Sequence, residues 1–197
     1  MRKKKHNKLT QNYITAWNYL KESKKFIYII LIVFLISAFI GFFVPIPESI
    51  LQQILEYIKE VLKQTEGKNV LQLMWFIFWN NAKVSLMGII FGIFLGVFPL
   101  SAAIGNGYLL GVVSSFVALG EGYMSLWKIF PHGIFELPAV FISLALGLRL
   151  GMFVFQKERI LTFKRHFVNS LRVFLLIILP LLIIAAVIES SLIFLLG

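Results

Sequence analysis

Apolar residues fall into five long stretches, and most of the charged residues lie between them. The stretches are residues 26–44, 75–98, 107–119, 134–155 and 173–196. A helix needs roughly 20 apolar residues to cross the hydrocarbon core of a bilayer. The pattern therefore predicts an all-α, polytopic membrane helical bundle with about five transmembrane helices, in which residues 26–197 form a single transmembrane domain.

Residues 48–69 have a different pattern. Their apolar residues recur at helical spacing, with charged residues between them: Ile50, Leu51, Ile54, Leu55, Ile58, Val61 and Leu62. This periodicity is typical of an amphipathic helix. We expect an outer amphipathic helix that lies on the membrane surface or on the other spans.

Two spans carry small residues at every fourth position. They are Gly88, Gly92 and Gly96 in the second span, and Ser143, Gly147 and Gly151 in the fourth. Small residues at this spacing form a flat stripe that lets another helix approach backbone to backbone. The two stripes predict that the second and fourth spans pack tightly together.

Turn-forming residues mark three expected breaks. Pro99 is expected to end the second span, and the uncharged segment 99–107, which ends in Asn106 and Gly107, predicts a short turn or re-entrant bend before a short third span. Pro131 and Gly133 indicate a turn ahead of the fourth span. A bend is also expected at Pro180 in the fifth span.

The composition agrees with a membrane protein, because 59% of the 197 residues are hydrophobic and only 14% are charged. The net charge is +10, with eight Lys and Arg in residues 1–25 and five in residues 156–172. Cytoplasmic loops carry an excess of basic residues. We therefore expect a multi-pass protein of the cell membrane with a cytoplasmic N-terminus and its C-terminus outside, and no nucleic-acid partner, since no nucleic-acid-binding motif accompanies the charge.

The first 25 residues form a basic tail with apolar residues at helical spacing, among them Leu9, Tyr13 and Trp17. This pattern predicts a cytoplasmic amphipathic helix on anionic lipid headgroups. A solvated tail that only sets the orientation remains an equal alternative.

A polar group is expected in the outer half of the bundle. His132 and Glu136, four residues apart, share a helix face, and we expect Glu189, Asn80 and Asn81 at a similar depth. The histidine and glutamates can satisfy a helix start, form a polar network that locks spans two, four and five, or bind a metal, proton or substrate.

Catalytic motifs are missing from the sequence. It holds no HExxH, no GxSxG, no phosphate-binding loop and no cysteine. We therefore expect no catalytic residue, no metal and no cofactor. Arg149, one turn from the end of the fourth span, is expected to reach the inner headgroups.

Several of the segments described above resemble the stage II sporulation protein M family. The resemblance covers roughly residues 75–190 and rests on Asn106-Gly107-x-x-x-Gly111, the PHGIFELPA block 131–139, the GLRLG run 147–151 and AAVIE at 185–189. It departs from the family pattern in its pronounced basic N-terminus and in the bulky SLAL at 143–146. The resemblance implies a membrane partner of peptidoglycan-degrading proteins that is not itself a hydrolase.

Two functions follow as hypotheses. The first is a non-enzymatic membrane anchor or scaffold for other membrane proteins or for further copies of itself. The alternative is a transporter or permease subunit for a small solute or lipid, working as a dimer, which is suggested by the expected break at 99–107 facing the polar group.

Overall fold

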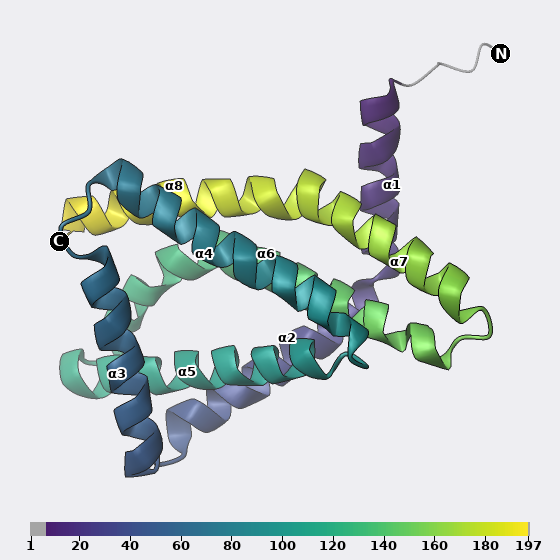
Figure 1. Ribbon diagram of the computed structural model, residues 1–197. Coiled ribbons are helices and arrows are strands. Elements are labelled where there is room, and N and C mark those ends of the chain that lie inside the picture. Colours follow the sequence, from purple (N-terminus) through teal and green to yellow (C-terminus); the bar gives the residue numbers. More distant parts are fainter. Residues whose placement is uncertain (1–6, 197) are drawn as a thin grey trace.

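The computed structural model describes residues 7–196, and within them every side chain except those of residues 127–132, 135, 195 and 196. All regular elements in this part are helical (Figure 1). The α-helices are α1 Lys8–Glu22, α2 Lys24–Phe43, α3 Glu48–Thr65, α4 Val70–Ile90, α5 Val97–Glu121, α6 Phe130–Gly151, α7 Arg159–Val173 and α8 Leu179–Leu196. The 3₁₀ helices are η1 Phe91–Ile93, η2 Tyr123–Ile129 and η3 Met152–Phe155, and a π-helix, η4, spans Phe174–Ile178.

Five helical segments in the described chain are long and apolar enough to cross a membrane. They are Lys24–Phe43, Val70–Ile93, Val97–Glu121, Glu136–Phe155 and the apolar part of Arg159–Phe194. The prediction of an all-α bundle with about five spans is confirmed. The last helix is longer than a span requires, and its apolar part begins near Val173, as the sequence predicted.

Two helix pairs in the bundle run parallel. In the first pair, Gly107 and Gly111 of α5 face the backbones of Phe34 and Ala38 of α2, so both residue numbers rise together. The second pair, α4 and α6, behaves in the same way, with Gly88 facing Leu144 and Gly92 facing Gly147. In each pair one helix runs back between the two members: α4 between α2 and α5, and α5 between α4 and α6.

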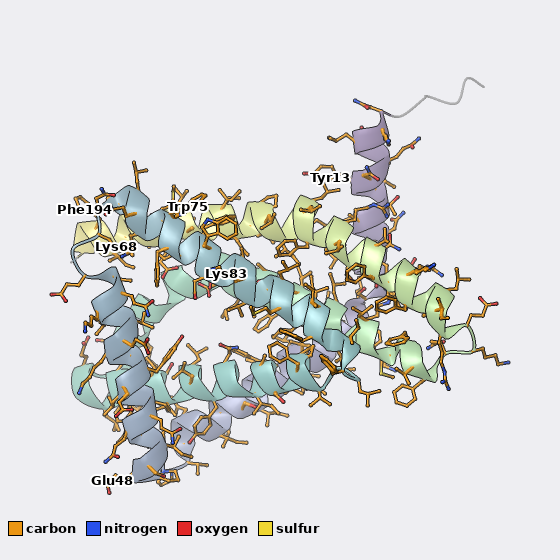
Figure 2. All side chains as sticks on the ribbon, in the orientation of Figure 1. Tyr13, Glu48, Lys68, Trp75, Lys83 and Phe194 are labelled. Atoms are coloured by element: carbon orange, nitrogen blue, oxygen red, sulfur yellow. The ribbon has the colours of Figure 1, made fainter. Side chains whose placement is uncertain are left out.

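This arrangement places the two ends of the described chain at opposite ends of the bundle (Figure 1). The α1 end also holds the α4–α5 turn and η3, and the α3 end holds η2 and the last residues of α8. Figure 2 shows the same separation, with Tyr13 and Phe194 far apart. The buried core lies mainly between α4, α6 and α8, and includes Ile89, Leu146, Ile178 and Leu182.

The second span ends earlier than the sequence predicted, and the expected break at Pro99 is wrong. The chain turns at Leu95 and Gly96, which have φ values of 54° and 71°. Glycine adopts this left-handed conformation without strain. Pro99 lies in the first turn of α5, where its missing N–H would have no helical partner in any case.

Residues 99–107 are therefore not a turn or re-entrant bend, and the third span is the regular 25-residue helix α5. Asn106 lies inside this helix and donates its side-chain N–H to the carbonyl oxygen of Ala102 at 2.8 Å. Gly107 also lies inside α5, and its missing side chain lets the backbone of α2 approach. Turn-forming residues here lie within a helix, where Asn106 bonds to its own helix and Gly107 packs against a neighbour.

The residues at which a turn was expected ahead of the fourth span belong to the helix itself. Helix α6 starts at Phe130, so Pro131 and Gly133 belong to its first turn. Proline is favoured at the start of a helix because its fixed φ suits the first turn and its N–H is not needed there. The basic segment 156–172 is also mostly helical, and η4 widens the helix just before Pro180.

The segment after the first span is a helix, α3, that lies across one end of the bundle (Figure 1). Not one residue of α3 is buried. Helix α1 stands at the opposite end, also across the direction of the spans. The two amphipathic helices therefore flank the spans from opposite ends.

We predict that Gly92→Ala destabilises the protein by about 1–3 kcal/mol, the usual cost of overpacking. A methyl group at this position would overlap the backbone of Gly147. The matched control is Gly105→Ala in α5, where a Cβ would meet no heavy atom within 4 Å. Thermal unfolding in detergent micelles measures both variants, and equal midpoints would contradict the close approach of α4 and α6.

Candidate functional site

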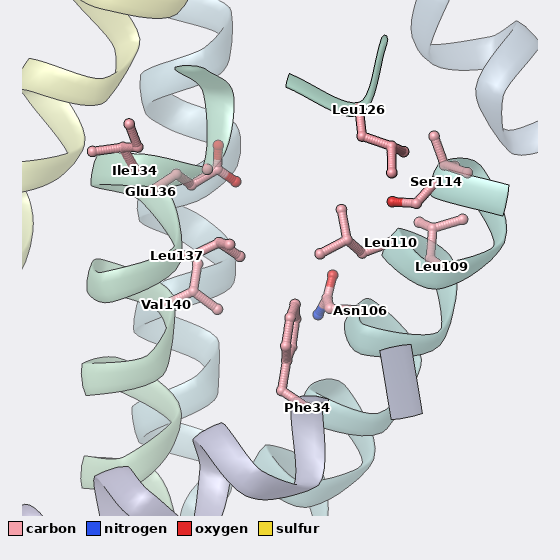
Figure 3. A pocket seen from close by; sticks show the side chains of 12 residues that line it. Phe34, Asn106, Leu109, Leu110, Ser114, Leu126, Ile134, Glu136, Leu137 and Val140 are labelled. Atoms are coloured by element: carbon pink, nitrogen blue, oxygen red, sulfur yellow. The ribbon is translucent and has the colours of Figure 1, made fainter. Parts of the chain in front are cut away.

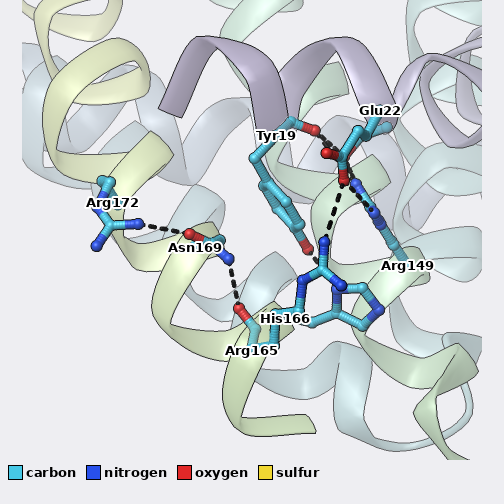
Figure 4. A network of polar contacts seen from close by, with 8 residues as sticks. Tyr19, Glu22, Arg149, Arg165, His166, Asn169 and Arg172 are labelled. Carbon is cyan, nitrogen blue, oxygen red and sulfur yellow. Dashed lines mark hydrogen bonds and ion pairs between the residues drawn. The ribbon is translucent and has the colours of Figure 1, made fainter. Parts of the chain in front are cut away.

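A polar cluster at the α1 end joins three helices that are distant in sequence (Figure 4). Arg149 of α6 donates from Nη1 to the carbonyl oxygen of Tyr19 at 3.2 Å and to Oγ of Ser23 at 2.8 Å. Its Nη2 forms an ion pair with Oε2 of Glu22 at 3.0 Å. The Arg149 side chain is only 12% exposed. The sequence led us to expect that Arg149 extends to the headgroups. It holds the end of α1 instead.

The Tyr19 ring connects this arginine to α7. The Arg149 guanidinium lies 4.2 Å from the centre of the Tyr19 ring, a cation–π contact. The Tyr19 hydroxyl lies 3.0 Å from Nδ1 of His166. Burial raises the pKa of Tyr19 above its ordinary value of 10.0. The phenol is therefore neutral, and its hydroxyl and Nδ1 of His166 share a hydrogen bond.

His166 precedes the apolar part of the last span and is held neutral. Burial lowers the pKa of His166 to about 4, and the positive charges of Arg149 and Arg165 lower it further. A neutral imidazole has one N–H donor and one acceptor nitrogen, so His166 adds no charge to the cluster. The cluster therefore carries its positive charge on arginines, with Glu22 as the counter-ion for both: Arg165 lies 3.8 Å from the same carboxylate oxygen.

A half-open cavity of about 570 Å³ lies towards the α3 end. One wall comes from α2 and α5, the other from α6, and Leu126 of η2 lies above it (Figure 3). Most of the lining is apolar, and the polar side chains are those of Asn106, Ser114 and Glu136. An apolar cavity with a few polar groups is the usual form of a small-molecule site.

The structure does not bring together all five residues of the predicted polar group. Glu136 lines the cavity, and Asn81 is buried inside the bundle. Asn80, its neighbour on α4, is exposed and lines a separate groove beside α3. One carboxylate oxygen of Glu136 and one of Glu189 are buried. The side chain of His132 lies outside the part of the chain that the structure describes.

The candidate metal ligands show no metal-binding arrangement within the described part of the chain. No three His, Cys, Asp or Glu side chains converge there. The residues of the two small-residue stripes, in contrast, lie against each other. Gly147 faces Gly88, Gly151 faces Gly92 and Gly96, and Ser143 lies beside Gly88.

Sequence reasoning missed the cluster around Arg149. Its partners lie more than 120 residues away in the chain, and no motif connects them. A charged residue inside an apolar span was the one available indication, because such a residue is usually paired.

We predict that Arg149→Met loosens α1. Hydrogen bonds to charged groups contribute about 1.5–3 kcal/mol, so their loss should speed amide exchange in residues 8–22 at least tenfold. The control is Arg172→Met, because the Arg172 guanidinium bonds to Asn169 of its own helix. Amide hydrogen exchange of both variants in nanodiscs, measured by mass spectrometry, tests this prediction. Unchanged protection of α1 in the Arg149 variant would show that the cluster does not hold α1.

The comparisons with known proteins agree with the arrangement of the spans. No curated protein and no solved structure shows a significant match to the chain. The family model described as Stage II sporulation protein M matches residues 30–192, which include all five spans except their outermost residues. The chain therefore belongs to the stage II sporulation protein M family.

Proposed function

We propose that the protein is a non-enzymatic membrane scaffold that binds a partner protein through α3. The observation that carries this proposal is the exposure of the apolar face of α3. Ile50, Leu55 and Leu62 are 39%, 44% and 62% exposed, although they follow helical spacing. An exposed apolar stripe on an amphipathic helix is typical of a surface that binds a membrane or another protein.

The proposed orientation puts the α1 end in the cytoplasm and α3 outside the cell membrane. The basic residues of segments 1–25 and 156–172 favour this orientation by the positive-inside rule. Helix α1 then lies at the inner leaflet with exposed Leu9, Tyr13 and Trp17 beside its lysines. Such a helix binds anionic headgroups through both its charge and its apolar residues.

The partner class follows from the family resemblance. A relative that serves peptidoglycan-degrading proteins needs a docking surface on the side of the membrane that faces the wall. In the proposed orientation, α3 occupies that side and is the longest extramembrane helix there. We therefore propose that α3 binds a wall-degrading protein, or a membrane protein associated with one.

The test is crosslinking in native membranes followed by purification in mild detergent. We predict that Leu55→Gln combined with Leu62→Gln reduces crosslinking of α3 to its partner at least tenfold, because the apolar contact is lost. The matched control is Gln53→Ala on the exposed polar face of the same helix. Recovery of the wild-type protein as a lone monomer, with crosslinking finding no partner, would overturn the proposal.

The cavity beside Glu136 favours a second candidate function, that of a transporter or permease subunit. The expected break at 99–107 no longer supports it, because that segment is helical. The cavity supports the transport hypothesis instead, since its volume suits a small solute and it opens from the interior of the bundle. Flux into proteoliposomes that is lost with Glu136→Gln would favour transport, whereas no substrate-dependent signal among ions, amino acids and lipids would exclude it.

A further inference from the structure

A groove of about 920 Å³ runs along the exposed face of α4. It begins at the α3–α4 connection with Lys68 and follows Trp75, Trp79 and Asn80 as far as Lys83. Two of these side chains form an edge-to-face pair, with the rings of Trp75 and Trp79 5.5 Å apart. The groove thus combines a rigid aromatic ridge with polar side chains on a helix that crosses the membrane.

Lys83 lies near the middle of its span. It is the fourteenth residue of α4, which places it about 20 Å from the helix start at a rise of 1.5 Å per residue. About 15 Å of helix separates it from the end of η1 at Ile93. Figure 2 shows Lys83 well inside α4, far from Lys68 at the helix start. A lysine side chain reaches a headgroup only from near a helix end.

The Lys83 side chain is exposed. Among the described side chains, none forms a hydrogen bond or ion pair with its ammonium group. A lysine at the centre of a span costs about 2.5–3.5 kcal/mol on insertion scales unless it is paired or hydrated. No described side chain compensates this charge, so a partner from outside the described chain would remove the cost.

We infer that the α4 groove binds a transmembrane helix of another protein, and that this helix carries an Asp or Glu at the depth of Lys83. The inference deepens the scaffold proposal and rests on it, because it names the chemistry of a partner within the membrane. An opposite charge is the complement that an ammonium group at the depth of the hydrocarbon core requires. The tryptophan ridge supplies apolar contact along the same face.

A second copy of this chain fits the groove poorly. A two-fold contact on this face would place one Lys83 near the other, because such a contact pairs the same surface of both copies. Among the carboxylates of the described spans, those of Glu136 and Glu189 each have a buried oxygen, and Glu121 lies at the very end of α5. A lipid also fits poorly, since its phosphate lies at the membrane surface and not at the depth of Lys83.

The test uses synthetic leucine-rich transmembrane peptides with Asp, Asn or Leu at the central position. The full-length protein is reconstituted in neutral phosphatidylcholine vesicles, and energy transfer between labels measures association. We predict that the Asp peptide binds at least tenfold more tightly than the Asn and Leu peptides. Lys83→Gln should remove the difference, while Lys83→Arg retains it.

The matched control is Lys59→Gln, which removes an exposed lysine of α3 and leaves the groove intact. Equal binding of the three peptides, or a preference for Asp that survives Lys83→Gln, would overturn the inference. Competition of added anionic lipid with the Asp peptide would also overturn it, because it would make Lys83 a lipid contact. The peptide assay does not involve the apolar face of α3, so its failure leaves the α3 docking proposal standing.

Discussion

Contact between helix backbones at glycine residues is the constraint on which the rest of this structure depends. Within hydrocarbon, apolar side chains gain little by leaving lipid for a protein neighbour, so helices associate through close packing and polar contacts. The pair α4–α6 meets where Gly92 faces the backbone of Gly147, and the pair α2–α5 meets where Gly107 faces that of Phe34. Each contact fixes a parallel pair, and together they determine the order of the crossings.

Helix α6 connects the main features of the molecule. Towards its end it presents Gly147 and Gly151 to α4, while Arg149, between them in sequence, points to α1. Nearer its start, Glu136 lines the cavity shared with α2 and α5. The glycine contacts position the arginine that holds the basic helix, and the same helix supplies the carboxylate at the other end of the bundle. The cavity and the Arg149 cluster therefore both depend on α6, which tight packing keeps in place.

The sequence predicted the elements well and some of their contacts. Hydrophobic stretches located the five spans, and helical periodicity located α3, because both depend on local pattern. The four-residue step of the glycines in α4 and α6 was enough to expect those helices together. The same reasoning did not extend to Gly107, because the neighbouring Pro99 and Asn106 favour turns as strongly as they tolerate a helix. Arg149 required knowledge of which distant segment it meets, and Lys83 required the true start of α4, which lies five residues earlier than predicted.

The central claim is that the chain crosses the membrane five times, with α4 and α6 parallel. The sequence has no cysteine, so single cysteines at Asn7, Gly67, Gly122 and Glu158 can be labelled with a membrane-impermeant maleimide. Labelling of intact cells and of inverted vesicles reports the side of each position. The account predicts that positions 7 and 158 label from one side and positions 67 and 122 from the other. Labelling of 67 and 158 from the same side would contradict it.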